Sequence, residues 1–216
     1  AAQSPVNDPM MSISAMAAVT ERLCFGVTAS LTYEVPYAIA RKMSTRDHIT
    51  KGRIAWNILT SYQQSAAENL GLERQIPHDE RYDIADEFLD VCYKLWEGSW
   101  EDNAVVRDRA AGIYTDPSKV HDIQHKGKYF SVPGSHLSEP SPQRTPFLFQ
   151  AGASARGRLF AARHAEAIFL TGTTPEEMRP IIDLLRMQIG EKCRAQISVT
   201  IIMMLARVAA RPEAEA

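Results

Sequence analysis

The sequence predicts an α/β fold whose strands run parallel, and three observations lead to this prediction. Five segments of strand length are almost continuously apolar, which is typical of parallel strands covered on both faces. Segments with helical periodicity alternate with them along the chain. Polar residues follow the apolar runs, at the edge where parallel α/β folds bind ligands. A (β/α)8 barrel and an open doubly wound sheet both fit this pattern, although five strands are too few to close an eight-stranded barrel.

The first quarter of the chain predicts two helices with a strand between them. Small and apolar residues recur at helical spacing over Pro9–Thr20, and Leu23–Leu31 has the apolar content of a buried strand. The second helix is predicted over Tyr37–His48, because Pro36 stands where helices prefer proline. Lys51-Gly52 then ends that helix.

A second strand and a long amphipathic helix follow. Arg53–Leu59 is apolar apart from Asn57, and Ser65–Leu70 predicts a short helix. Pro77 precedes a helix predicted from about His78 to Trp96. Its apolar face is formed by Tyr82, Ala85, Phe88, Leu89, Cys92, Leu95 and Trp96.

The segment of about 97–145 interrupts this alternation. It is rich in glycine and proline, and Ile123–Val132 resembles a short hairpin around Lys126-Gly127-Lys128. Its apolar content is too low for a separate core, so we interpret it as an insertion in a single domain over 1–216.

The alternation of strands and helices then resumes. We predict strands over Pro146–Ala151, Ala167–Thr171 and Ile197–Leu205. We predict helices over Arg156–His164, from Thr174-Pro175 to about Cys193, and from Arg211-Pro212-Glu213.

Composition excludes several classes of protein. The 216 residues are 45% hydrophobic with a net charge of −2, which is typical of a globular domain with a sizeable core. No run of Lys and Arg predicts nucleic-acid binding, and no apolar run reaches the length of a membrane span. Ala1–Asp8 has no apolar signal-peptide core. Three widely spaced cysteines (Cys24, Cys92, Cys193) favour reduced thiols and a cytoplasmic location.

Polar residues at two strand ends are the first candidates for a ligand site. Thr28 lies near the end of the first strand, while Asn57, Thr60 and Ser61 lie at the end of the next. Either they are hydrogen-bonded loop residues, or they contact a polar ligand.

The start of the long helix holds a second pair. His78 and Tyr82 are four residues apart and therefore share one helix face, where they would bind or protonate a ligand. The alternative is a capped, partly buried helix start. The acidic residues of this helix predict a mostly solvated face (Asp79, Glu80, Asp83, Asp86, Glu87).

Gln150–Gly157 is a strand end followed by a small-residue turn and a helix. Such a turn lets backbone N–H groups and the hydroxyl of Ser154 approach an anion at the helix N-terminus. The segment is neither a GxGxxG nor a Walker motif, and a tight turn with Ser154 as helix cap is an equal alternative.

Metal and nucleophile chemistry are not supported. His121, His125 and His136 match no standard zinc spacing, and the chain has no Gly-x-Ser-x-Gly motif. We therefore predict no metal site and identify no catalytic residue.

Four segments carry a resemblance to a known family: Thr28–Ser61, His78–Trp100, Asp116–Gly134 and Glu139–Leu170. They resemble the flavin-dependent monooxygenases of the nitrilotriacetate and dibenzothiophene-sulfone type, within the bacterial-luciferase-like superfamily. The resemblance implies a TIM-barrel-like (β/α)8 fold, here incomplete with about five parallel strands. It also implies reduced FMN from a separate NAD(P)H-dependent flavin reductase, O2 as co-substrate, and insertion of one oxygen atom into a small organic substrate.

The resemblance assigns roles to individual residues. Thr28, Asn57, His78 and Tyr82 match positions that contact FMN or line the site, and Ser154 matches a phosphate-binding serine. Because an open five-stranded sheet exposes edges and apolar surface, a homo-oligomer is expected. The alternative to an active enzyme is a non-catalytic remnant or interaction subunit of the same family.

Overall fold

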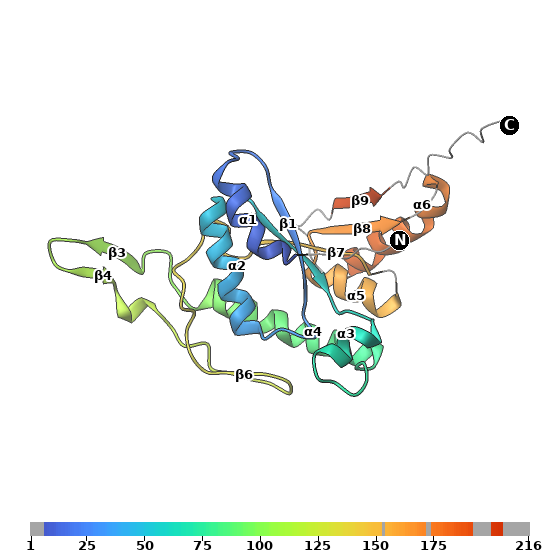
Figure 1. Ribbon diagram of the computed structural model, residues 1–216, viewed down its shortest axis with the longest axis horizontal. Coiled ribbons are helices and arrows are strands. Elements are labelled where there is room, and N and C mark those ends of the chain that lie inside the picture. Colours follow the sequence, from blue (N-terminus) through green and yellow to red (C-terminus); the bar gives the residue numbers. More distant parts are fainter. Residues whose placement is uncertain (1–6, 153, 172–173, 192–199, 205–216) are drawn as a thin grey trace. The chain divides into compact units, whose positions relative to one another are not determined.

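The computed structural model describes residues 7–152, 154–171, 174–191 and 200–204 (Figure 1). The chain divides into two compact units, Ala1–Leu148 and Phe149–Ala216. The single domain expected over 1–216 stays a prediction.

Helix α1 (Pro9–Ala18) opens the described part of the first unit. Asp8 caps it, because the Asp8 carboxylate accepts a hydrogen bond of 2.8 Å from the backbone N–H of Met10. The helix buries Ile13 and Ala17, so the predicted apolar periodicity is confirmed.

Strands β1 (Phe25–Ser30) and β2 (Ile54–Leu59) pair in parallel, with Phe25 opposite Ile54 and Ser30 opposite Leu59. Side chains alternate between two faces along both strands. One face is fully buried and includes Trp56, whose indole N–H donates to the carbonyl of Ala29 at 3.1 Å. The opposite face is more open and carries the polar side chains considered below.

Helix α2 (Pro36–Thr50) lies between these strands in the chain, and helices α3 (Gln64–Asn69) and α4 (His78–Tyr93) follow β2. Helix α2 ends where Lys51 takes a left-handed conformation (φ 54°), as the Lys-Gly pair predicts. Helix α4 continues into a π-helical turn, η1 (Lys94–Gly98), whose Trp96 donates to the carbonyl of Ala40 at 3.1 Å. The predicted helix to Trp96 is therefore present, with a wider last turn.

The insertion contains two antiparallel hairpins and a 3-10 turn. Their bounds are β3 (Val105–Asp108) with β4 (Ile113–Thr115), η2 (Pro117–Lys119), and β5 (His125–Lys126) with β6 (Ser131–Val132). The second hairpin is the one that the sequence predicts. The first was not predicted, because all residues of 106–114 are exposed and show no apolar alternation.

A buried carboxylate fastens the end of the insertion to the first unit. Asp47 accepts hydrogen bonds from the backbone N–H and the side-chain amide of Gln143, at 2.7 and 2.6 Å. The same amide donates to the carbonyl of Ile54, the first residue of β2. The insertion therefore returns to the amino end of β2.

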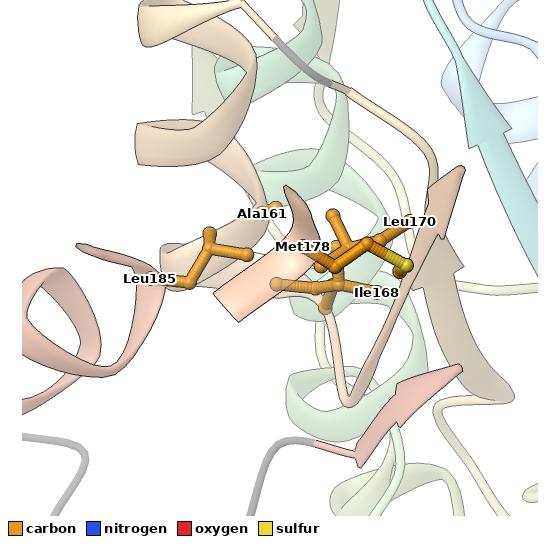
Figure 2. Packing of buried hydrophobic residues seen from close by; sticks show 6 residues of the cluster. Ala161, Ile168, Leu170, Met178 and Leu185 are labelled. Atoms are coloured by element: carbon orange, nitrogen blue, oxygen red, sulfur yellow. The ribbon is translucent and has the colours of Figure 1, made fainter. Parts of the chain in front are cut away.

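Strand β7 (Phe147–Gln150) begins at the end of the first unit and continues into the second. The second unit also contains strands β8 (Ala167–Thr171) and β9 (Thr200–Met204), with helices α5 (Ala155–His164) and α6 (Pro175–Glu191). Strand β8 pairs in parallel with β7 and with β9. Figure 2 shows how β8 packs against the helices. The buried cluster consists of Ala161, Ala165, Ile168, Leu170, Met178 and Leu185.

The pairing of five strands in parallel, with helices between them, confirms the predicted α/β class. The predicted helix at 211–213 and parts of the predicted elements at 192–199 and 205 lie outside the described residues. Among the helices that the structure describes, none has the length and apolar character to cross a membrane.

Candidate functional site

The carboxyl edge of β1 and β2 is held by side-chain hydrogen bonds. Thr32 donates to the carbonyl of Thr60 at 2.5 Å, and Ser61 donates to the hydroxyl of Ser30 at 2.9 Å. Ser61 has a left-handed backbone (φ 53°), which is uncommon for a residue other than glycine. The polar residues that the sequence places at two strand ends thus meet and order one edge.

Thr28 and Asn57 lie side by side on the open face of these strands. They are register partners, and the Asn57 amide donates to the Thr28 hydroxyl at 3.0 Å. The side-chain oxygen of Asn57 is buried and has no hydrogen-bond partner among the residues that the structure describes. An acceptor in this state is costly unless another group satisfies it.

Helix α4 begins at the same edge. The side chain of Gln75, three residues before α4, donates to the phenol oxygen of Tyr33, which follows β1, at 2.6 Å. The rings of His78 and Tyr82 lie 5.3 Å apart at 63°, so the predicted shared face is confirmed. Tyr82 is buried, whereas His78 is exposed and bonded to the carboxylate of Asp79 at 2.6 Å.

Arg81 is a site residue that sequence reasoning missed. It is only 7% exposed, and its Nε and Nη1 atoms have no hydrogen-bond partner in the described parts of the chain. It lies in the first turns of α4, where the helix dipole is positive and disfavours a cation. Buried N–H groups of a cation are normally hydrogen-bonded, so these two atoms are suited to an acceptor such as an anion.

A signal for Arg81 was present in the sequence. Arg81, Ala85, Phe88 and Cys92 follow one another at helical spacing along the buried face of α4. Arginine is rarely buried, so an arginine that continues an apolar helix face indicates a residue that needs a specific partner.

Ser154 belongs to the second unit and caps α5. Its hydroxyl oxygen accepts a hydrogen bond of 3.0 Å from the backbone N–H of Gly157, so the predicted cap is confirmed. A hydroxyl that accepts in this way still has its own proton to donate. The predicted phosphate contact stays a prediction.

Gly152, in the turn before Ser154, leaves room for a neighbouring side chain. A Cβ on Gly152 would collide with the side-chain amide of Gln150, which is buried at the end of β7. The oxygen of this amide has no hydrogen-bond partner among the described residues. Gly152 thus allows Gln150 to lie against the turn.

Glu87 is an exception to the mostly solvated acidic face that the sequence predicts for α4, because its carboxylate is hydrogen-bonded to the β5–β6 hairpin. Its carboxylate accepts hydrogen bonds from the consecutive backbone N–H groups of Lys128, Tyr129 and Phe130 and contacts His125. Desolvation acts to raise the pKa of Glu87, but these hydrogen bonds outweigh it and hold the pKa below its usual value. Glu87 therefore anchors the β5–β6 hairpin.

The three insertion histidines have separate partners. His121 bonds to Glu101 at 2.9 Å, His125 bonds to Glu87, and His136 bonds to Ser44 at 2.9 Å. Within the described ranges, no three His, Cys, Asp or Glu side chains come together in a way that would hold a metal ion.

Comparison with known proteins identifies close relatives over most of the chain. The family model described as "Luciferase-like monooxygenase" matches residues 2–216. A long-chain alkane monooxygenase of Geobacillus thermodenitrificans is 64% identical over 86% of this chain and 42% of its own length. A dimethyl-sulfide monooxygenase of Hyphomicrobium sulfonivorans is 58% identical over 94% of this chain and 42% of its own length. Nitrilotriacetate monooxygenase component A of Aminobacter aminovorans is 41% identical over 77% of this chain and 37% of its own length.

Solved structures agree with these relatives. A crystal structure of long-chain alkane monooxygenase matches with a TM-score of 0.90 and 60% identity, over 93% of this chain and 46% of that one. A riboflavin lyase crystallised with modified FMN and riboflavin matches with a TM-score of 0.87 and 42% identity, over 92% of this chain and 44% of that one. The chain thus spans less than half the length of the relatives named here.

Proposed function

Because this chain belongs to the luciferase-like monooxygenase family, we propose that it forms part of a flavin-dependent monooxygenase that inserts one oxygen atom from O2 into a small organic substrate. The resemblance inferred from the sequence is confirmed, and with it the TIM-barrel fold of the family, of which this chain carries five parallel strands. The observation that carries the proposal is that two buried nitrogens of Arg81, Nε and Nη1, have no hydrogen-bond partner among the described residues.

Reduced FMN fits the residues at this edge. Its phosphate is a dianion that supplies the partner which Arg81 lacks, and helix N-termini favour such anions. His78, half exposed and one helical turn before Arg81, offers an imidazole ring for a hydrogen bond. Tyr82, stacked edge-on to His78, provides a phenol at the same helix face.

Asn57 and Thr28 fit the polar part of the flavin. The unpaired oxygen of Asn57 accepts a hydrogen bond, and a flavin offers N–H and ribityl O–H donors that would satisfy it. The hydrogen bond between Asn57 and Thr28 keeps the amide oriented before a ligand arrives. We therefore assign these two residues to orientation of the cofactor.

Ser154, in the second unit, is proposed as the alternative to Arg81 as partner of the single phosphate of FMN. Its hydroxyl proton and the N–H groups at the start of α5 suit a phosphate, as the sequence predicts. This assignment rests on the family resemblance and on the chemistry of the cap.

Bound FMN would supply the redox chemistry with O2, and the chain's own residues would bind it, orient it and limit access of water. The side chains with these tasks are Arg81 for charge, His78 for hydrogen bonding, and Asn57 and Thr28 for orientation. The ordered edge made by Ser30, Thr32, Thr60 and Ser61 keeps their strands in register.

The remaining components are proposed by analogy. A relative named as component A supports a separate flavin reductase, for which we propose NADH or NADPH as the electron source. The relatives' names cover alkanes, dimethyl sulfide and nitrilotriacetate, so the substrate class here is a small organic molecule without further definition. A homo-oligomer and a cytoplasmic location stay predictions from the sequence.

Anaerobic calorimetry with reduced FMN tests the proposal. Arg81→Met is expected to weaken FMN binding about ten- to a hundredfold, since a hydrogen bond to a charged group contributes about 1.5–3 kcal/mol. The matched control is Arg41→Met, at an exposed position of α2, which is expected to bind FMN like the unaltered chain. Reduced riboflavin, which has no phosphate, is expected to show no difference between the Arg81 variant and the unaltered chain.

Equal FMN affinity of the Arg81 variant and the control would refute the anion site. Turnover with a reductase, O2 and candidate substrates separates an enzyme from a non-catalytic remnant. A chain that binds FMN but oxidises no substrate would favour the remnant.

A further inference from the structure

Tyr33 joins the carboxyl edge of β1 to the segment before α4. It comes three residues after β1, directly after Thr32, whose hydroxyl fastens this edge to the carbonyl of Thr60. Its phenol oxygen accepts a hydrogen bond of 2.6 Å from the side-chain amide of Gln75, three residues before α4. Tyr33 therefore lies where the end of β1 meets the approach to α4.

The orientation of the Gln75 side chain is fixed by its other partners. Its oxygen accepts a hydrogen bond of 3.0 Å from the backbone N–H of Ile76, so its N–H₂ group is the end that faces Tyr33. The same N–H₂ group donates to the carbonyl of Gln63, after β2, at 3.3 Å. The backbone N–H of Gln75 donates to the side-chain oxygen of Gln64 at 3.0 Å. Gln75 is thus the donor toward Tyr33, and the phenol oxygen is the acceptor.

The phenol of Tyr33 keeps a proton to donate. A hydroxyl that accepts a hydrogen bond still carries its own O–H, and no described residue accepts the proton of Tyr33. On the neighbouring strand β2, the buried side-chain oxygen of Asn57 also has no partner among the described residues. One carboxyl edge therefore presents both a donor and an acceptor that the described residues leave unused.

Backbone strain marks the same edge. Ser61 has a φ of 53°, and its hydroxyl donates to Ser30 at the end of β1. A left-handed residue other than glycine persists only where the surrounding structure holds it, and such residues cluster at ligand sites. The strain is consistent with an edge that is shaped for a ligand.

Reduced FMN offers two kinds of acceptor to such a donor. Its phosphate oxygens are already assigned to Arg81 or Ser154, which belong to helix starts. Tyr33 instead follows β1, the strand of Thr28, which pairs with Asn57 and is assigned to the uncharged part of the flavin. Carbonyl and ribityl oxygens in that part accept hydrogen bonds from a phenol.

We propose that Tyr33 donates a hydrogen bond to the uncharged part of the reduced flavin, and that Gln75 is the positioning residue for this contact. The contact rests on the proposed function, because it adds a residue to the same site. Gln75 acts through its N–H₂ group, which occupies the phenol oxygen and so leaves the proton for the ligand.

Anaerobic calorimetry with reduced FMN and with reduced riboflavin tests the contact. Tyr33→Phe removes only the hydroxyl and is expected to weaken both ligands equally, about three- to tenfold, which is the range of one uncharged hydrogen bond. Tyr114→Phe is the matched control, because it removes a phenol that is bonded to Glu139 in the insertion. The control is expected to bind both flavins like the unaltered chain.

Gln75→Glu separates a ligand contact from a structural tie. A glutamate carboxylate has no N–H to donate, so its hydrogen bond with Tyr33 reverses and uses the phenol proton within the chain. The two segments stay joined, yet the affinity for both flavins is expected to fall as in Tyr33→Phe. Gln63→Glu places the same charge at an exposed position nearby and is expected to bind both flavins normally.

Three results would overturn the Tyr33 contact. The first is full affinity in Tyr33→Phe, and the second is a loss with FMN alone, which would place the phenol at the phosphate. The third is a loss in Tyr33→Phe with full affinity in Gln75→Glu, because only the tie between the segments would then matter. An unaltered chain that binds neither flavin would refute the proposed function together with this contact, whereas binding that depends on Arg81 but not on Tyr33 would refute the contact alone.

Discussion

Glu87 offers a direct test of how the insertion is held to the first unit. Its carboxylate receives hydrogen bonds of 3.0 Å from the backbone N–H of Lys128, 3.0 and 3.1 Å from Tyr129, and 2.8 Å from Phe130. The side chain is 15% exposed, so these bonds are only partly shared with water. We predict that Glu87→Gln releases the β5–β6 hairpin from α4 while the rest of the unit stays folded.

The expected magnitude follows from the geometry. A glutamine keeps one oxygen for Phe130, but it turns an N–H₂ group toward the N–H of Lys128 and loses the charge. A hydrogen bond to a charged group contributes about 1.5–3 kcal/mol, and bonds to one carboxylate are not additive. We therefore expect a loss of about 2–3 kcal/mol in the local opening free energy, or about 30- to 150-fold faster amide exchange at Lys128, Tyr129 and Phe130.

Hydrogen exchange measured on peptides covering 125–132 is the assay. Glu21→Gln, at an exposed position of the first unit, is the matched control and is expected to leave this exchange unchanged. Gly127→Ala is an independent perturbation of the same anchor, because its Cβ would collide with the Glu87 carboxylate. Unchanged exchange in Glu87→Gln, with α4 still protected, would refute the anchoring role.

The pH dependence of Glu87 has a defined sign. Its folded-state pKa is below the usual value of 4.5, so the unfolded state binds more protons near that pH. The stabilisation by Glu87 is fully present above the unfolded pKa and is lost as pH falls through the folded pKa.

Two further predictions concern other parts of the chain. Burial, and then the charge of His48, lower the pKa of His136 from 6.5 to about 4. The free energy of unfolding is therefore expected to decrease as the pH is lowered from about 6.5 to about 4, by at most about 1.4 kcal/mol per pH unit. Denaturant unfolding at about pH 7 and about pH 5 measures this decrease, and an equal decrease in His136→Gln would contradict the assignment to His136. Gly152→Ala is expected to displace Gln150 and disturb the turn before Ser154, weakening reduced-FMN binding, whereas Gly98→Ala, whose Cβ meets no atom within 4 Å, is the matched control for calorimetry. Equal FMN affinity of the two glycine variants would refute the role of the turn.

Sequence periodicity predicted the elements that bury one face. Strand β2 is the clearest case, since Ile54, Trp56 and Ile58 are fully buried while Asn57 points to the other face. The β5–β6 hairpin was predicted from its Lys-Gly-Lys turn, but the β3–β4 hairpin was not. Hydrophobic periodicity marks strands with one buried face, and residues 106–114 of the β3–β4 hairpin are exposed on both faces.

The sequence predicted the polar and aromatic residues of the candidate site but not its buried arginine. Strand order and helix spacing placed Thr28 beside Asn57 and His78 beside Tyr82, because both are local rules. Arg81 was not predicted as a site residue, because its acidic neighbours in the sequence suggest a solvated cation and only its helical spacing indicates burial. The same packing turned Glu87 from an apparent surface residue into an anchor.

The candidate ligand site and the anchors of the insertion lie at opposite ends of the same two strands. The unsatisfied groups of Asn57 and Arg81 belong to the carboxyl edge, while Asp47 and Glu139 fix the insertion at the amino edge. Because each edge is ordered by its own hydrogen bonds, a change at one is not transmitted through a shared side chain. Arg81→Met is therefore expected to weaken FMN binding while leaving amide exchange at Gln143, on the amino edge, unchanged.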